Sequence, residues 1–402
     1  MIGRLAEPDD RIYDAVVVGA GPAGAMSAVV LAGSGASVLL VDRAAFPRYK
    51  VCGCCVNPRA LATLREAGQG GLVDRLGGVP LSRFTLGCGG RRATISQALG
   101  VAVSRAAFDA ALVSAAEERG ATFAPETTAS LGPATSPDFR ELRLRADGRS
   151  RTVRGRFVVS ATGLADTLRE ALGGGASEDA ARAHRADHGS KIGAGVVVPG
   201  VPGIYPEGEI AMACGRDGYV GLVRLEDGSL NLAAAMAPEA VRRGGGIGPL
   251  AARILEQAGF PMIPDLEALP WKGTPPLTRA ARTVASNRVF RVGDAAGYVE
   301  PFTGEGMAWA LAAGATLAGI LVESLADEGR SPERRWADAH RRVVTRGQLV
   351  CRAARLALRF PSLTGTLVRI LQAQPRLAHP VLRSIHRTRT RPPVPWSGGV
   401  HP

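Results

Sequence analysis

Two short glycine-rich segments have the residue types and spacing that could bind a nucleotide. The first has the spacing G-x-G-x-x-G, which brings backbone N–H groups and the positive end of a helix to a diphosphate. The second follows a Gly-Asp pair and can place another helix N-terminus beside negative charge. The segments are Gly19-Ala-Gly21-Pro22-Ala23-Gly24 and Gly293-Asp294 with Gly304-Glu-Gly306.

The elements around the first segment predict a βαβ unit. Tyr13–Gly19 and Ser37–Asp42 are short apolar runs typical of buried parallel strands, and the Ala-rich stretch Gly24–Ser34 between them predicts a helix. Asp42 closes the second strand, where a carboxylate can bind ribose hydroxyls, and we assign Arg43 to the same site. A glycine turn without a ligand is the less favoured alternative. By itself this unit does not distinguish FAD from NAD.

The second segment resembles the Gly-Asp box of FAD enzymes such as para-hydroxybenzoate hydroxylase and the geranylgeranyl reductases. The resemblance implies that Asp294 binds the ribityl chain, that the amides of Gly304 to Met307 face the flavin pyrimidine edge, and that Pro301 lies beside the ring. Asp294 also has a simpler interpretation as a helix-flanking cap.

Two further segments match the same family. Ser104-Arg105-Ala-Ala-Phe-Asp109 resembles its Arg-x-x-x-Asp element, which implies that Arg105 lies near the cofactor. Pro47-Arg-Tyr-Lys-Val-Cys52-Gly53 resembles the Pro-x-x-Lys-x-Cys-Gly loop of the reductases. The chain departs from the family at Ala161-Thr-Gly163, where Ala-Asp-Gly is usual, although we keep Gly163 among the cofactor residues. The predicted cofactor is non-covalent FAD, with NAD(P)H as the electron donor.

The fold implied is a Rossmann-like, para-hydroxybenzoate-hydroxylase-like α/β domain with an antiparallel substrate-binding sheet and a helical C-terminus. Three runs at Glu209–Cys214, Tyr219–Leu225 and Leu230–Ala235, separated by Gly-containing turns, predict the antiparallel meander. The predicted FAD-binding domain comprises 1–80, 100–172 and 275–330, the substrate sheet 81–99 and 173–274, and the basic C-terminal region 331–402, with a disordered tail.

Three cysteines form the loop Cys52-Gly-Cys54-Cys55, for which three interpretations stay open. It lines the substrate pocket near the flavin, which we favour, or carries redox thiols, or binds a metal. Disulfide geometry disfavours a bridge between adjacent cysteines, and no second cluster completes a zinc set. We predict no metal site and interpret His184 and His188 as surface residues. Cys52, Cys54 and Tyr219 are the predicted pocket residues.

The charge of the chain is concentrated at its end. The formal net charge is +13, and twelve arginines with no acidic residue follow from position 341 onward. Leucines and isoleucines interleave with these arginines, a basic amphipathic pattern that predicts peripheral membrane contact or domain closure rather than nucleic-acid binding. The acidic N-terminus and unevenly spaced cysteines predict a cytoplasmic protein. The apolar stretch Gly306–Val322 predicts a buried helix rather than a membrane span.

Three functions are compatible with these patterns, and no residue is assigned as catalytic. Hydroxylation of a lipophilic aromatic or polyketide by a monooxygenase is marginally favoured. The chain lacks the reductases' Tyr-x-Trp-x-Phe-Pro motif around Tyr219 and looks most like bacterial flavoproteins found near type III polyketide synthases. Reduction of isolated C=C bonds of an isoprenoid is the alternative, suggested by the Cys52 loop. A membrane-docked flavin-binding protein without turnover is the third hypothesis.

Overall fold

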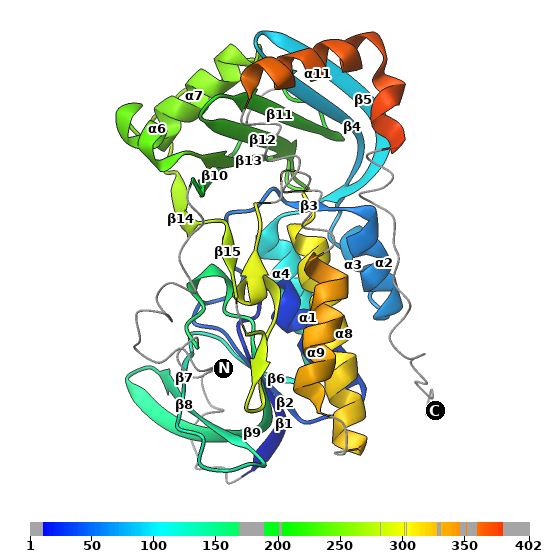
Figure 1. Cartoon of the computed structure of the whole chain (residues 1–402), viewed down its shortest axis with the longest axis vertical. Coiled ribbons are helices and arrows are strands. Elements are labelled where there is room, and N and C mark those ends of the chain that lie inside the picture. Colours follow the sequence, from blue (N-terminus) through cyan, green and yellow to red (C-terminus); the bar gives the residue numbers. More distant parts are fainter. Residues whose placement is uncertain are drawn as a thin grey trace.

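Two eight-stranded sheets organise the molecule, one below and one above in the view of Figure 1. The computed structural model describes residues 11–168, 189–200, 203–281, 283–300, 302, 304–327, 331–345, 351 and 360–380. His184 and His188, which we interpreted as surface residues, and the predicted disordered tail from position 387 lie outside these residues.

The lower sheet contains the predicted βαβ unit and has a parallel centre. Its strands run in the order β16-β17-β9-β1-β2-β6, with β8 paired to β9 and β7 to β8. All pairs from β17 to β6 are parallel, as expected for apolar strands buried between two layers. The bounds are β1 Ile12–Val18, β2 Val38–Val41, β6 Thr122–Ala124, β7 Thr128–Leu131, β8 Arg140–Ala146, β9 Arg149–Ser160, β16 Ala285–Ser286 and β17 Val289–Arg291.

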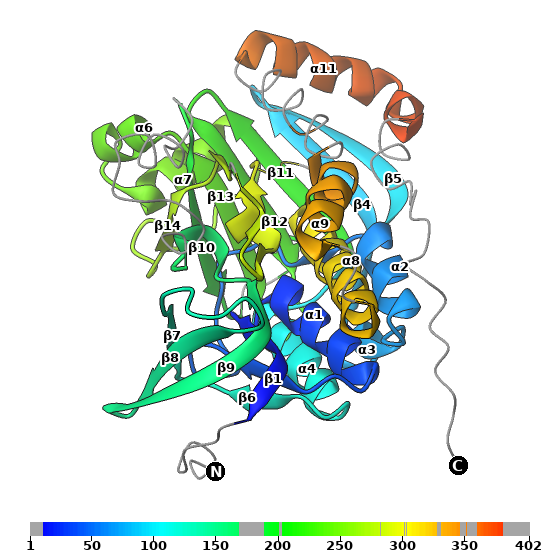
Figure 2. The ribbon, with the colours of Figure 1, turned by 60° about the horizontal axis from the view of Figure 1, so that its bottom comes forward.

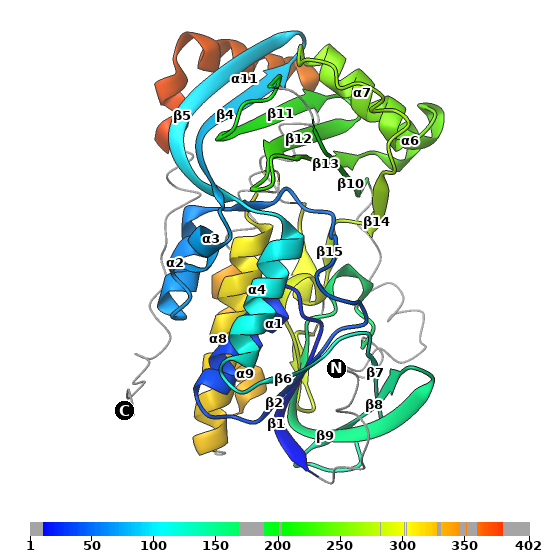
Figure 3. The same cartoon turned by 180° about the vertical axis from the view of Figure 1, so that it is seen from behind.

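Helices cover one face of this sheet (Figures 1 and 3). The strands β7 and β8 extend the sheet beyond β9, and side chains of β8 pack on its other face. Asn57 and Ser104 cap α2 and α4 with their side chains. Fully buried Trp336 of α9 belongs to the same hydrophobic core as α1. The helices are α1 Pro22–Gly33, α2 Pro58–Glu66, α3 Leu72–Arg75, α4 Arg105–Glu117, α8 Gly306–Ala326 and α9 Pro332–His340, which the π-turn η4 Arg341–Thr345 follows.

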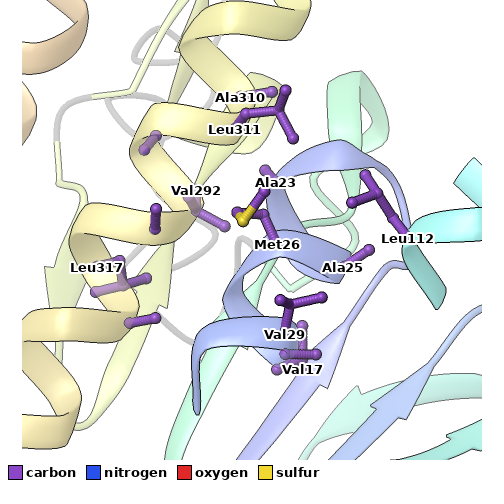
Figure 4. Packing of buried hydrophobic residues seen from close by; sticks show 14 of the residues in the cluster. Val17, Ala23, Ala25, Met26, Val29, Leu112, Val292, Ala310, Leu311 and Leu317 are labelled. Atoms are coloured by element: carbon purple, nitrogen blue, oxygen red, sulfur yellow. The ribbon is translucent and has the colours of Figure 1, made fainter. Parts of the chain in front are cut away.

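Helices α1 and α8 approach each other closely because small residues face each other. A Cβ atom on Gly314 would lie 2.3 Å from the carbonyl oxygen of Ala23, so only glycine fits there. Ser27 Oγ donates to the Gly314 carbonyl at 3.2 Å. Figure 4 shows the side chain of Met26 on α1 next to Val292, on the side of α1 that faces α8. This packing brings the two glycine-rich segments to the same end of the helix pair.

One described helix is long and apolar enough to cross a membrane. It is α8, and 72% of its most apolar window is buried inside the protein. The prediction that this stretch is a core helix is confirmed.

The upper sheet contains the predicted meander, with one parallel pair. Its order is β14-β10-β13-β12-β11-β4-β5-β3, and β11 runs parallel to β4 because the chain returns to this sheet only after crossing the lower domain. The bounds are β3 Cys55–Val56, β4 Val79–Cys88, β5 Arg91–Ala102, β10 Ile192–Val198, β11 Glu209–Gly215, β12 Gly218–Arg224, β13 Leu230–Met236 and β14 Lys272–Pro276.

Three helices pack on the upper sheet. Helices α6 (Pro238–Arg243) and α7 (Ile247–Gln257) cover one face, where Leu250 and Leu255 meet the meander. Helix α11 (Pro361–Ala373), followed by the short turn η5 (Pro375–Ala378), contacts β4 and β5 (Figure 2).

Candidate active site

The turn between β1 and α1 requires glycine at two positions. Gly19 has φ +104°, a conformation that side-chain-bearing residues rarely adopt, and its Cβ would lie 2.3 Å from the Ala161 carbonyl oxygen. A Cβ on Gly24 would lie 1.9 Å from the Gly19 carbonyl oxygen. These contacts give the first and third glycines of the motif the packing roles that the sequence predicts.

Gly21 has a different role, because nothing in the described protein crowds it. The nearest side-chain atoms to its hypothetical Cβ are Arg48 Nη2 at 3.7 Å and Arg105 Nη2 at 3.8 Å. Pro22 and Ala23 begin α1, whose N-terminus carries no side-chain cap in the described structure. Free backbone N–H groups, a helix dipole and two guanidinium groups thus surround an open cradle, which fits a diphosphate.

Asp42 lies beside this turn at the end of β2. Its carboxylate accepts hydrogen bonds from the backbone N–H groups of Ala20, at 2.8 Å, and Ala44, at 2.9 Å. Arg48 Nη2 approaches the same carboxylate at 3.6 Å. The residue therefore sits where the sequence predicts a ribose contact, while Arg43 next to it is exposed.

Arg48 is a residue of the site that the sequence reasoning did not assign. Its Nη1 lies 3.3 Å from Asp109 Oδ2, and Arg105 binds the same carboxylate through Nε and Nη2, both at 2.8 Å. Asp109 is fully buried. The signal for Arg48 was its place in the Pro-x-x-Lys-x-Cys-Gly segment, but only the fold brings that loop to the glycine turn.

The Gly-Asp box meets the first segment from the other side. Gly293 has φ +63° and opens the short helical turn η3 (Gly293–Ala296), which directly follows β17. Its Cβ would lie 2.9 Å from that of Ala23. Burial raises the pKa of Asp294 above its ordinary value, and the cations Lys50 and Arg105 oppose this shift. Arg105 therefore interacts with both segments.

The remaining predicted cofactor residues surround the same region. Gly163, with φ +69°, begins a short turn, η1 (Gly163–Ala165), that contacts η3. Gly304 has φ +73°, and its Cβ would lie 4.0 Å from that of Cys55. Gly306 begins α8, whose N-terminus also lacks a side-chain cap in the described structure, and Met307 is buried. Pro301 lies outside the described residues.

The cysteine loop lies between these segments and the upper sheet. Asn231 of β13 donates through Nδ2 to the Cys52 carbonyl at 2.9 Å, which ties the loop to the sheet. All three thiols are free. A hydrogen bond from Cys54 and the Arg105 cation lower the pKa of Cys52 to about 6, although burial opposes this. Burial and the neighbouring Cys52 raise the pKa of Cys55 to about 12.

Cys52 is therefore expected to be a thiolate at neutral pH and to react selectively with iodoacetamide. Alkylation of Cys52 should be slow below about pH 6, where the thiol is protonated, and should rise to a plateau above it. Peptide mass spectrometry of protein alkylated across a pH series measures this. Cys55, which is also partly exposed, is the internal control and should stay unmodified at neutral pH. The prediction would be contradicted if the rate of Cys52 alkylation reached half its plateau only near the pKa of an ordinary thiol.

Aromatic and charged residues line the side of the site that faces the upper sheet. The ring of Tyr219 on β12 packs edge-on against Phe302 at 5.1 Å between centroids. Lys191 Nζ lies 2.9 Å from buried Glu300 Oε1 and 5.2 Å from the Tyr219 ring. Tyr298 forms a two-stranded ladder, β18 (Gly297–Tyr298) with β15 (Arg279–Ala280).

Both tyrosine hydroxyls stay protonated at neutral pH. Burial, followed by the Glu300 carboxylate, raises the pKa of Tyr219 well above its ordinary value. Burial, followed by the nearby carboxylate of Asp294 and the Cys52 thiol, raises the pKa of Tyr298 in the same way. These neighbours place Tyr298 between the Gly-Asp box and the Tyr219 group. Among the described residues, no group of three His, Cys, Asp or Glu side chains could hold a metal ion.

Comparison with known proteins agrees with this geometry. Residues 12–187 match the model of an FAD binding domain. The chain is 29% identical to a menaquinone reductase of Mycobacterium tuberculosis over 89% of this chain and 86% of that protein. A flavoprotein/dehydrogenase from Cytophaga hutchinsonii superposes with a TM-score of 0.76, at 17% identity, covering 94% of this chain and 93% of that one.

A second solved structure of similar fold is pqsL, a probable FAD-dependent monooxygenase from Pseudomonas aeruginosa. It superposes with a TM-score of 0.69 at 19% identity and covers 89% of this chain and 99% of that one. The predicted para-hydroxybenzoate-hydroxylase-like α/β fold is confirmed by these likenesses.

Proposed function

We propose that this FAD-dependent oxidoreductase of the para-hydroxybenzoate hydroxylase and geranylgeranyl reductase superfamily reduces a carbon–carbon double bond in a lipophilic isoprenoid substrate. NAD(P)H is the proposed electron donor. The observation that carries the proposal is an apolar cluster that joins the upper sheet to the Gly-Asp box and contains two protonated tyrosines. Tyr219 belongs to its buried core, and Tyr298 and Phe302 pack against it.

The apolar lining supports a lipophilic substrate. Met212, Leu86 and Ile95 come from three neighbouring strands of the upper sheet and share the face that carries Tyr219. Burial of an isoprenoid chain against such a surface is favourable by about 25 cal/mol for each Å² of apolar area removed from water. The similarity to a menaquinone reductase along most of the chain supports the same class of substrate.

The chain's own residues supply binding, orientation and a proton. The cradle at Gly21, with Arg48 and Arg105, would hold the diphosphate of FAD, and Asp294 would hold its ribityl chain. When bound and reduced by NAD(P)H, the flavin would supply the two electrons that the reduction requires. Saturating a double bond also consumes a proton, which the hydroxyl of Tyr219 or Tyr298, both protonated at neutral pH, would donate. The Lys191–Glu300 pair orients Tyr219.

Hydroxylation by a monooxygenase is the second candidate, on the strength of one observation. Strand β12 reads Tyr219-Val-Gly-Leu-Val-Arg and so lacks the aromatic residues of the reductases' Tyr-x-Trp-x-Phe-Pro motif. Where that motif has a bulky aromatic side chain this strand has Gly221, and the side chain of Met212 lies 3.3 Å from the position its Cβ would take. An association with type III polyketide synthases remains a prediction from resemblance.

Turnover without oxygen distinguishes the two reactions. We expect purified protein with FAD, NAD(P)H and a prenylated naphthoquinone in detergent to form product under strictly anaerobic conditions. After air oxidation returns any hydroquinone to the quinone, mass spectrometry should still show a product heavier by two hydrogen atoms, with the gain located in the prenyl chain. A reaction without NAD(P)H is the control for product that was already present in the protein or substrate preparation. Product that appears only with O₂ and is heavier by one oxygen atom would contradict the proposal and support hydroxylation.

A further inference from the structure

Helix α11 exposes an apolar face to solvent. Of the eight large apolar side chains exposed in the described part of the chain, five lie between positions 360 and 377. Leu363, Leu367 and Ile370 are 53%, 44% and 47% exposed and share one helical face, because they are spaced by four and three residues. The other two are Phe360, before the helix, and Leu377, after it.

The buried face of α11 belongs to the apolar cluster of the active site. Val368 is fully buried and Leu371 is 7% exposed, and both pack in the cluster that contains Tyr219. Tyr298 and Phe302, beside the Gly-Asp box, pack against this same cluster. One helix therefore separates solvent from the apolar lining next to the cofactor site, and Figure 2 shows it lying along the outer side of β4 and β5.

The described residues of this helix and of the turn after it include two arginines, Arg369 and Arg376, and no aspartate or glutamate. From Arg341 to the last residue the chain carries twelve arginines and no aspartate or glutamate, so almost the whole formal net charge of +13 lies in this stretch. Arg369 and Arg376 are exposed within the described part of it. An apolar helix face with arginines around it is the pattern of helices that lie in the interface of an anionic bilayer.

We propose that the exposed face of α11 docks this enzyme on an anionic membrane surface. Leu363, Leu367 and Ile370 insert among the lipid tails, and Arg369 and Arg376 contact the lipid phosphates. Charge complementarity favours a bilayer over a second copy of this chain, because two copies meeting through this face would bring Arg369 and Arg376 of each copy together. Docking in this way places the inner face of α11 between the lipid and the Tyr219 cluster, so a lipophilic substrate has a short route to the site.

Vesicle flotation of the FAD-loaded protein tests the proposal without any turnover, so it is independent of the proposed reaction. We expect the wild type to float with vesicles of phosphatidylcholine and phosphatidylglycerol in equal parts and not with phosphatidylcholine alone. The variant Leu363→Gln/Leu367→Gln/Ile370→Gln should bind the anionic vesicles at least about tenfold more weakly. High salt should also weaken wild-type binding.

The matched control removes exposed apolar side chains elsewhere. Ile204→Gln/Met262→Gln changes two residues that are 41% and 48% exposed and should float as the wild type does. Flavin absorbance and the melting temperature check that all variants are folded. The proposal is overturned if the triple variant floats like the wild type, or if neutral vesicles bind equally well. It is also overturned if light scattering shows a wild-type dimer that the triple substitution dissociates, without vesicle binding.

Discussion

Replacing Gly21 by alanine is expected to leave the protein folded but to weaken FAD binding at least about 100-fold, or about 2.7 kcal/mol. The backbone at Gly21 is extended, with φ −76°, so alanine adopts it without strain. The new Cβ meets nothing in the described protein closer than Arg48 Nη2 at 3.7 Å. This Cβ occupies the space through which a diphosphate reaches the first turn of α1. The substitution therefore excludes the diphosphate without disturbing the protein itself.

Titration of the apo protein with FAD, followed by fluorescence quenching, measures this loss, and circular dichroism melting checks the fold. Gly203→Ala is the matched control, because this exposed residue of the upper-sheet domain would also have no neighbour within 4 Å of its Cβ. Gly24→Ala should behave differently and destabilise the protein, since its Cβ would lie 1.9 Å from the Gly19 carbonyl oxygen. Wild-type affinity in Gly21→Ala would show that no diphosphate approaches this turn.

The substitution Arg105→Leu is expected to destabilise the protein by about 3–5 kcal/mol and also to weaken FAD binding. It leaves the fully buried carboxylate of Asp109 without its bidentate partner, and an uncompensated buried charge costs this much. The loss should fall at the lower end of the range, because Arg48 still lies 3.3 Å from Asp109. Urea unfolding measures the stability, and the FAD titration measures the affinity.

The double variant Arg105→Leu/Asp109→Leu separates the two effects. Removing both charges leaves no buried carboxylate to compensate, so most of the stability should return. FAD affinity should stay low, because the guanidinium that faces both Gly21 and Asp294 is still absent. If FAD affinity recovered together with stability, Arg105 would have only a structural role.

The sequence alone determined the features that depend on short stretches of chain. A G-x-G-x-x-G turn between two apolar runs predicts its strand, helix and strand, because each glycine satisfies a local backbone or packing requirement. The caps at Asn57 and Ser104 follow from hydrogen bonds that span three residues. The meander followed from turns with glycine between alternating apolar runs, and its three strands pair antiparallel.

Only the tertiary structure decided how distant segments meet. The Cys52 loop is tied to Asn231 across 179 positions, and Lys191 pairs with Glu300 across 109, which no local pattern encodes. The same is true of Arg48 beside Gly21 and of α11 behind the Tyr219 cluster. The hydrogen bond from Cys54, in the same loop, contributes most to the low pKa of Cys52, but the Arg105 cation that lowers this pKa further comes from α4. Local geometry is set by neighbours in the chain, whereas electrostatics and pocket lining are set by neighbours in space.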